Sequence, residues 1–405
     1  MRKNEYENLD RIYSIAIMSP FIILTIQYFL LANLMKIGID IGSTIQLFSK
    51  VLVGLVLFHS IIVLIIKNKI TFIITYLLIT LIFLVQYTFF IENRPYMQEL
   101  IFPLFFMCLP LFTISLEIKN FNVFKNIMFK SSIIIYLFGV LLAIQDFTGI
   151  VDIGVYSGPL SNYLLIPTIV FIDKFFDKMK FTYLLFSIVS GFFILVLGSR
   201  GALLCILFYL VVKFMLFDTG KWALNYLIKL TMPIFFIIIV SSYKLILVNL
   251  QSILLSYRIE SRSIELFLND NLYLSGRDYI YSQLTDYIIA NPIIGFGIGG
   301  DRRILDGIAV YAHNIGLEVL GDFGILFGSV IIIIFTFSII HILLKKKNIK
   351  RKIIIVWLSI GFIHLFISSS YLIEMKFWIL LGLMINILFI NKSSKQEIEN
   401  YDGVS

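Results

Sequence analysis

The chain has 405 residues, of which 59% are hydrophobic and only 14% are charged, and its mean hydropathy is +0.96. These values exclude an ordinary soluble globular domain, whose surface is rich in charge. The net charge of +8 does not indicate a nucleic-acid partner, because most Lys and Arg residues lie in short segments between apolar runs, as they do in membrane proteins.

Apolar runs recur along nearly the whole chain and predict an all-α, multi-pass membrane protein. A helix needs about 20 residues to cross the hydrocarbon core, which is roughly 30 Å thick. Transmembrane strands would instead alternate polar and apolar positions. About twelve spans are predicted, near residues 12–34, 45–66, 70–91, 100–116, 130–145, 160–172, 181–197, 202–217, 226–248, 315–344, 353–371 and 375–391.

The distribution of Lys and Arg predicts the orientation of these spans. If the N-terminus lies inside, about two thirds of the 33 basic residues fall on the inner side, as the positive-inside rule requires. Both termini are therefore predicted to be cytoplasmic. The tenth span is too long for one straight crossing, so we expect its first turns, before Gly321 and Gly324, to lie at the outer surface.

One outer segment, residues 249–312, is more polar and much longer than the other connections. It divides the chain into 1–248 with nine spans, the large loop 249–312, and 313–405 with three spans and a cytoplasmic tail. Within the loop, apolar residues at helical spacing predict an amphipathic helix lying on the membrane or on the helix bundle; they are Ile280, Leu284, Tyr287 and Ile288. Asn291-Pro292 is expected to end that helix.

Three polar residues fall on the predicted outer face and are candidates for catalysis. Arg200 lies in the turn between the seventh and eighth spans, Arg277 begins the amphipathic helix, and His313 precedes the tenth span. The planar fork of donors on an Arg suits a phosphate. A neutral imidazole can accept a proton from a hydroxyl or orient it.

Each of these residues also has a purely structural interpretation. Arg200 can extend toward lipid headgroups, Arg277 can pair with a neighbouring carboxylate such as that of Asp278, and a lone histidine at a helix start is often structural. Glu318, about one helical turn beyond Asn314, is a candidate for orienting His313 or an acceptor sugar. A surface hydrogen bond is the alternative role for Glu318.

No metal or cofactor is predicted. The outer segments contain no clustered His and Cys ligands and no Asp-x-Asp pair. The glycine-rich stretch 295–300 lacks the Lys-Ser/Thr of a phosphate-binding loop and the strand that precedes a dinucleotide site.

The order and spacing of several short motifs resemble the O-antigen ligase and O-antigen/capsule polymerase superfamily. These motifs are Gly-Ser-Arg-Gly at 198–201, Gly-Arg at 276–277, Asn-Pro-Ile-Ile-Gly-Phe-Gly-Ile-Gly at 291–299, His-Asn at 313–314 followed by Leu317, and Gly-Asp-Phe-Gly at 321–324. The resemblance covers roughly residues 195–330, and the rest of the chain matches only as a multi-pass membrane protein.

The resemblance implies an inverting, metal-independent glycosyltransferase of a bacterial inner membrane, with its active site on the extracytoplasmic side. The donor would be an oligosaccharide linked to undecaprenyl diphosphate, and a chain-length regulator and a flippase are the expected protein partners. Arg200 and Arg277 would bind the donor diphosphate, and His313 would act near the acceptor hydroxyl. Arg303, Asn314 and Glu318 are further candidates for substrate contact.

Three activities remain open at this point. A polymerase would transfer the growing glycan to a lipid-linked repeat unit, and we favour it because no further acceptor-binding feature is visible. A ligase would transfer the glycan to lipid A-core or to another surface acceptor. A flippase or other transporter would be expected to place charges along a path between inverted repeats, and no such repeat is visible.

Overall fold

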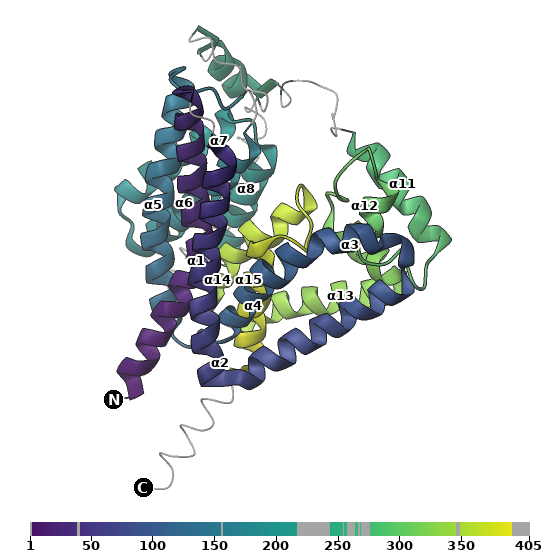
Figure 1. The fold of residues 1–405 in the computed structure, drawn as a ribbon. Coiled ribbons are helices and arrows are strands. Elements are labelled where there is room, and N and C mark those ends of the chain that lie inside the picture. Colours follow the sequence, from purple (N-terminus) through teal and green to yellow (C-terminus); the bar gives the residue numbers. More distant parts are fainter. Residues whose placement is uncertain are drawn as a thin grey trace. The chain divides into compact units, whose positions relative to one another are not determined.

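The computed structural model of the chain describes residues 2–38, 41–154, 157–216, 244–253, 255–256, 264–265, 268, 276–345 and 349–390. The described residues form helices and connecting turns with no strand, as predicted (Figure 1). They belong to two compact units, here called unit 1 (Met1–Pro20, Lys50–Met128 and Leu274–Ser405) and unit 2 (Phe21–Ser49 and Phe129–Tyr273). Each unit is described by itself.

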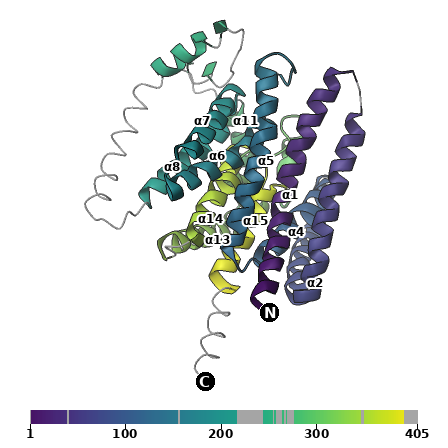
Figure 2. The same cartoon turned by 90° about the vertical axis from the view of Figure 1, so that its left-hand side faces the viewer.

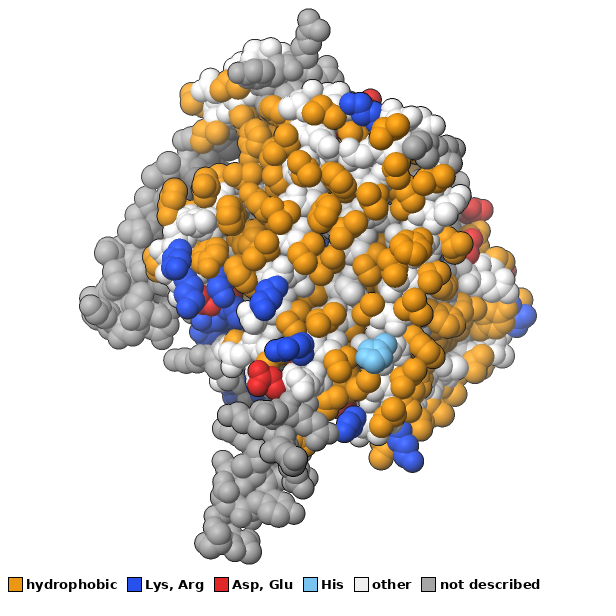
Figure 3. All heavy atoms as spheres, turned by 60° about the vertical axis from the view of Figure 1, so that its left-hand side comes forward, with side chains coloured by type: hydrophobic (Ala, Val, Ile, Leu, Met, Phe, Trp, Pro, Cys, Tyr) orange, Lys and Arg blue, Asp and Glu red, His pale blue; other side chains and the backbone are white. Residues whose placement is uncertain are grey.

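The protein is a membrane protein. Five of the described helices are long and apolar enough to cross a bilayer: Tyr6–Lys36, Gly42–Phe89, Ile91–Leu116, Phe121–Phe147 and Ile315–Lys345. Hydrophobic side chains predominate on the face shown in Figure 3, which suits contact with lipid. The total of about twelve spans stays a prediction, and most of the predicted span 226–248 lies outside the described residues.

Unit 1 contains most of the described helices. Two helices contribute their ends to it, α1 (Arg2–Lys36) and α5 (Phe121–Phe147), and α2 (Gly42–Phe89) contributes the part from Lys50. The others are η1 (Ile91–Asn93), α3 (Arg94–Ile101), η2 (Phe102–Cys108), α4 (Leu109–Leu116), α11 (Arg277–Ala290), α12 (Gly300–Ile304), α13 (Ile315–Lys345), α14 (Ile349–Trp357), η3 (Leu358–Phe362), η4 (Ile363–Phe366), α15 (Met375–Ile385) and η5 (Asn386–Ile390).

Helix α2 is bent where two separate spans were predicted. Asn68 has φ −150° and ψ 67°, which is not helical, and it divides α2 into two arms. The two lysines that flank it, Lys67 and Lys69, are the charged residues that separated the predicted spans. The Asn68 carboxamide donates a hydrogen bond of 2.8 Å to Glu117, at the end of α4.

The helix predicted within the loop is present as α11, although it also exposes apolar side chains such as Ile289. It begins at Arg277 and ends before Asn291, as expected. Ile280, Leu284 and Ile288 are buried, whereas Tyr287 is 44% exposed, so the buried stripe is narrower than predicted. The remainder of the predicted loop 249–312 is described only in part.

Unit 2 contains α6 (Gly158–Lys178), α7 (Phe181–Val196) and α8 (Arg200–Met215), which are labelled in Figure 2. The Thr168 hydroxyl of α6 donates to Ser190 of α7 at 2.7 Å. Lys213 forms a buried ion pair with Asp173, and the Tyr209 hydroxyl donates to the same carboxylate at 3.0 Å. Charges inside apolar helices are costly unless they are paired, and this group supplies the pairing.

Candidate active site

The glycine-rich loop that follows α11 packs directly on a break in α13. Gly324 has φ 75° and ψ 167°, which is not helical, so the hydrogen bond that normally joins residues i and i+4 fails there. The Gly321 carbonyl instead accepts from the Phe296 N–H at 2.7 Å, and the Ile325 N–H donates to the Pro292 carbonyl at 2.7 Å. The loop therefore satisfies backbone groups that the break would leave unpaired in the interior.

Two glycines make this contact sterically feasible. An added Cβ at Gly295 would collide with the Gly321 carbonyl, and one at Gly324 would collide with the Ile293 carbonyl. Both glycines also have positive φ values, which side chains disfavour. The motifs at 291–299 and 321–324 are thus two sides of one backbone contact, which holds the start of α13 in place.

His313 lies immediately before α13 and faces α11. Its backbone has φ 54°, a left-handed conformation that is uncommon for a histidine and marks a position worth a functional hypothesis. Its carbonyl accepts a hydrogen bond of 3.3 Å from the Tyr281 hydroxyl of α11. Its ring packs on Tyr311 with centroids 4.4 Å apart. These contacts fix the imidazole without using its Nδ1 atom, which is buried and has no hydrogen-bond partner.

Arg277, the first residue of α11, acts electrostatically on His313. Burial and, to a smaller extent, the positive charge of Arg277 together lower the pKa of His313 to about 4. The imidazole is therefore neutral at physiological pH. Arg277 thus lies close enough to His313 to influence its pKa, and the catalytic roles of both residues stay predictions.

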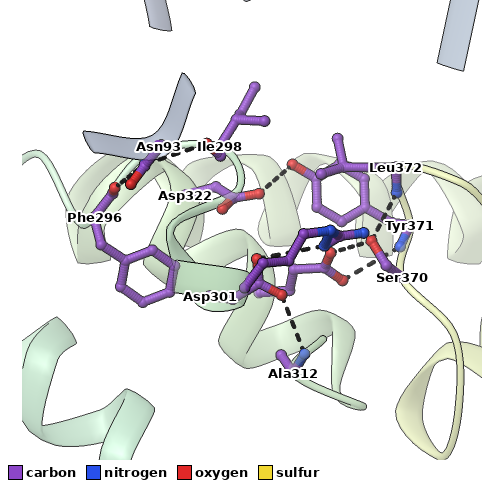
Figure 4. A network of polar contacts seen from close by, with 11 residues as sticks. Asn93, Phe296, Ile298, Asp301, Ala312, Asp322, Ser370, Tyr371 and Leu372 are labelled. Carbon is purple, nitrogen blue, oxygen red and sulfur yellow. Dashed lines mark hydrogen bonds and ion pairs between the residues drawn. The ribbon is translucent and has the colours of Figure 1, made fainter. Parts of the chain in front are cut away.

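A second set of polar residues is buried next to these elements (Figure 4). Its three carboxyl side chains, those of Asp301, Glu318 and Asp322, are fully buried. Glu318 accepts from the Ser370 hydroxyl and from the Tyr371 N–H at 3.3 Å. The Tyr371 hydroxyl donates to Asp322 at 2.7 Å, and the Trp378 indole donates to the Tyr371 carbonyl at 2.8 Å. We call Asp301, Arg302, Glu318, Asp322, Ser370 and Tyr371 the buried acid cluster.

The buried acid cluster has more acids than bases. Arg302 lies 3.6 Å from Asp301 Oδ1, and Asp301 Oδ2 accepts from the Ala312 N–H at 3.1 Å. Burial raises the pKa of Asp301, against the opposing effects of the Arg302 charge and of these backbone donors. If every group were ionised, three carboxylates would face one guanidinium, which is unfavourable in a dry interior. The cluster therefore favours a protonated carboxyl.

Glu318 and Asn314 have clear structural partners. Glu318 is bonded to residues 370 and 371, so its carboxylate ties the first turn of α13 to the segment before α15. Asn314 accepts hydrogen bonds from the N–H groups of Gly316 at 2.9 Å and Leu317 at 3.4 Å, which is the role of a helix N-cap. Neither contact involves His313, so substrate binding by these two residues stays a prediction.

Arg303 is engaged by the turn between α2 and α3. Its guanidinium forms an ion pair with Glu92, and its Nε donates to Asn93 Oδ1 at 2.9 Å. The Asn93 carboxamide in turn donates to the carbonyls of Phe296 at 2.7 Å and Ile298 at 3.2 Å. Arg303 thereby helps to hold the glycine-rich loop, and its predicted contact with substrate remains a prediction.

Arg200 belongs to unit 2, where it is the first residue of α8. The preceding Ser199 caps this helix by accepting a hydrogen bond of 3.4 Å from the Ala202 N–H. The predicted role of Arg200 at the same diphosphate as Arg277 stays a prediction. Within the part of the chain that the structure describes, no group of three or more His, Cys, Asp or Glu residues could hold a metal ion.

Sequence reasoning did not single out the partners of the buried acid cluster. Asp322 carried a signal, since it is an acid at the start of a long apolar run. Ser370 and Tyr371 carried none, because only the fold brings them to α13.

In comparisons with known proteins, the chain matches no family model, no curated protein and no solved structure.

Proposed function

We propose that this protein is a membrane glycosyltransferase that polymerises a cell-envelope polysaccharide. It would transfer the growing glycan from undecaprenyl diphosphate to a lipid-linked repeat unit at the extracytoplasmic face of a bacterial inner membrane. One observation carries the proposal: a neutral His313 with an unpaired buried Nδ1 lies within the electrostatic reach of the Arg277 cation. The motif resemblance around these two residues supports the same activity.

The proposed chemistry needs one base and one cationic group. The acceptor hydroxyl oxygen forms a bond to the anomeric carbon of the donor while the bond from that carbon to the diphosphate oxygen breaks. The hydroxyl proton passes to His313, which is neutral and able to accept it. The electron pair of the broken bond leaves with the diphosphate, whose growing negative charge Arg277 stabilises. Attack opposite to the leaving group inverts the anomeric centre.

Reconstitution tests this proposal. The purified protein in vesicles is supplied with the undecaprenyl-diphosphate-linked repeat unit alone, without nucleotide sugar or metal, and the products are separated by chain length. We expect a ladder of products for the polymerase. Products that form only after a second acceptor is added would assign a ligase instead, and no product in either case would contradict both activities.

A transporter is the second candidate, and the buried acid cluster favours it. Asp322 is fully buried near the start of α13, and buried ionisable groups in membrane proteins often belong to proton and ion pathways. Movement of the intact lipid-linked oligosaccharide across sealed vesicles, without formation of a glycosidic bond, would support this alternative. Bond formation without movement would exclude it.

A further inference from the structure

An apolar groove opens in unit 1 between the two arms of α2 and the helices α3, η2 and α4. Its volume is about 880 Å³, which lies within the range of small-molecule sites. The two arms diverge from the bend at Asn68 (Figure 1). Most of the groove walls are aromatic or aliphatic, and they include Leu57, Phe58, Phe72, Phe83, Phe102 and Phe105.

Water is a poor occupant of this groove. A space of 880 Å³ would hold about thirty water molecules at roughly 30 Å³ each. Walls of this composition offer few hydrogen-bond partners to retain them. Because α2 is one of the helices able to cross a bilayer, the surrounding medium is hydrocarbon. A hydrocarbon chain therefore fits the groove better than any polar ligand.

The groove extends from the bend of α2 to a polar end at Tyr87, here called the mouth. Ile65 and Phe72 line it on either side of the bend, whereas Lys50 and Tyr87 line it at the far ends of the two arms. The second arm runs roughly 22 Å from Phe72 to Tyr87 at 1.5 Å per residue. That length exceeds one leaflet of hydrocarbon, about 15 Å, so a lipid chain can lie inside with its headgroup at the mouth.

The mouth carries positive charge and hydrogen-bond donors. The Arg94 guanidinium lies 5.0 Å from the centre of the Tyr87 ring, and its Nε donates to the Tyr87 carbonyl at 3.0 Å. The Gln98 carboxamide, which also lines the groove, donates to the Tyr87 hydroxyl at 3.0 Å. A guanidinium beside a carboxamide donor suits the phosphate of a lipid headgroup.

The mouth also adjoins the loop of the candidate active site. The Ile298 N–H donates to Gln86, the neighbour of Tyr87, at 3.1 Å, and Asn93, the neighbour of Arg94, donates to Phe296 and Ile298. A lipid in the groove would therefore present its headgroup beside the glycine-rich loop. A lipid-linked substrate must bring its headgroup to the candidate active site, whereas an ordinary bilayer lipid need not.

We propose that the groove between the arms of α2 and the helices α3, η2 and α4 binds the polyprenyl chain of the lipid-linked substrate, with its phosphate at the mouth beside Tyr87 and Arg94. The choice of a polyprenyl chain over a phospholipid chain rests on the proposed function. The groove itself, its apolar walls and its cationic mouth do not depend on that function.

The test fills the groove with a side chain. Gly54 lines the groove, and a Cβ at this position meets no atom within 4 Å, so Gly54→Phe enters open space. Gly191 of α7 is a matched control, because a Cβ there also meets nothing within 4 Å. Binding of undecaprenyl phosphate to the purified full chain in detergent is measured for the wild type, Gly54→Phe and Gly191→Phe, with thermal unfolding to verify that each variant is folded.

We expect Gly54→Phe to weaken binding by at least about tenfold, which corresponds to about 1.4 kcal/mol, and Gly191→Phe to bind as the wild type does. Equal binding by both variants would overturn the proposal. Displacement of the probe by phosphatidylglycerol at equal concentration would also overturn it, since the groove would then be a general lipid site.

A second measurement does not depend on the folding of any variant. A polyprenyl phosphate with a photoreactive group in its chain is irradiated with the wild-type protein, and the labelled peptides are identified. Labelling of the groove segments 50–87 and 98–110 is expected, and labelling confined to other segments would contradict the proposal. If the probe labels the groove and Gly54→Phe blocks binding but no glycan is formed, the proposed function fails and the groove assignment stands. If polymer forms and Gly54→Phe changes neither binding nor yield, the groove assignment fails and the function stands.

Discussion

Unit 1 contains two neighbouring groups of polar side chains that differ in how they are bonded. The carboxylate of Glu318 is fully buried, and its two oxygens accept hydrogen bonds from Ser370 and Tyr371. His313 is only partly buried, and its Nδ1 has no partner.

This difference separates side chains that stabilise the fold from side chains that can take part in the reaction. Groups whose hydrogen bonds are satisfied within the protein fix the fold, because removing one partner leaves the other unpaired in the interior. A side chain that is partly exposed and makes no hydrogen bond of its own within the protein is the better candidate for contact with a ligand. We therefore expect substitutions of Glu318 to act mainly on stability and substitutions of His313 or Arg277 to act mainly on rate.

The largest expected effect is that of His313→Ala on the rate of glycan transfer. Loss of a general base typically lowers a rate by about 10²- to 10⁴-fold, whereas the unfolding temperature should stay close to that of the wild type. The rate is measured with the reconstituted protein and the lipid-linked repeat unit. His59→Ala, which removes an exposed histidine from α2, is the control and should retain full activity. A normal ladder of products from His313→Ala would remove this residue from the proposed site.

Glu318→Ala should have the largest effect on stability. It leaves the Ser370 hydroxyl and the Tyr371 N–H without their acceptor, and each unpaired buried group costs about 1–3 kcal/mol. Glu318→Gln, which keeps one acceptor oxygen and removes the charge, should cost less. The free energy of unfolding in detergent measures both.

Asp286→Ala is the control for that comparison, because Asp286 is an exposed carboxylate on α11 and surface substitutions usually change stability by less than about 0.5 kcal/mol. A Glu318→Ala protein as stable as Asp286→Ala would show that the cluster does not support the fold. A stable but inactive Glu318→Ala protein would instead move Glu318 to the chemistry.

Arg277→Lys should reduce the rate of transfer by about tenfold, because one ammonium cannot reproduce the two parallel hydrogen bonds of a guanidinium to a phosphate. Arg277→Ala should reduce it further. The measurement is again the initial rate of transfer, compared with the unfolding temperature of each variant. Full activity of the lysine variant would indicate that Arg277 supplies charge without directional bonding.

Much of this arrangement could be predicted from the sequence. Features that depend on neighbouring residues could be predicted. Helical spacing indicated the helix at Arg277, the Asn-Pro pair indicated its end at Asn291, and two lysines indicated an interruption where α2 bends. The carboxylate of Glu318 could not be assigned to its partners. Its hydrogen bonds join residues more than 50 positions apart, and no spacing rule encodes such a contact.

The site shows the same division. Arg277 and His313 were predicted to share one face, which stays a prediction, and in the structure Arg277 lies close enough to His313 to lower its pKa. The roles of the glycines at 295 and 324 could not be predicted. They allow the backbones of two segments that are distant in the sequence to pack closely together. The sequence shows that a glycine is present, whereas only the folded structure shows which atom would clash with a side chain at that position.

The smallest expected effect is a pH dependence that distinguishes His313 from the buried acids. Burial, assisted by Arg277, lowers the pKa of His313 to about 4, below its ordinary value of about 6.5. Its base form is therefore present above pH 4 and is lost as the pH falls through that value, so the rate should be level from about pH 5 to 8 and fall about twofold near pH 4. Removing the Arg277 charge in Arg277→Gln should move this decline to higher pH, because a nearby positive charge opposes protonation.

The rate of transfer by the wild type and by Arg277→Gln is measured from pH 4 to 8 over the range in which both stay folded. A decline at the same pH in both proteins would assign the titrating group elsewhere, and the acids around Glu318 would then be the first to examine.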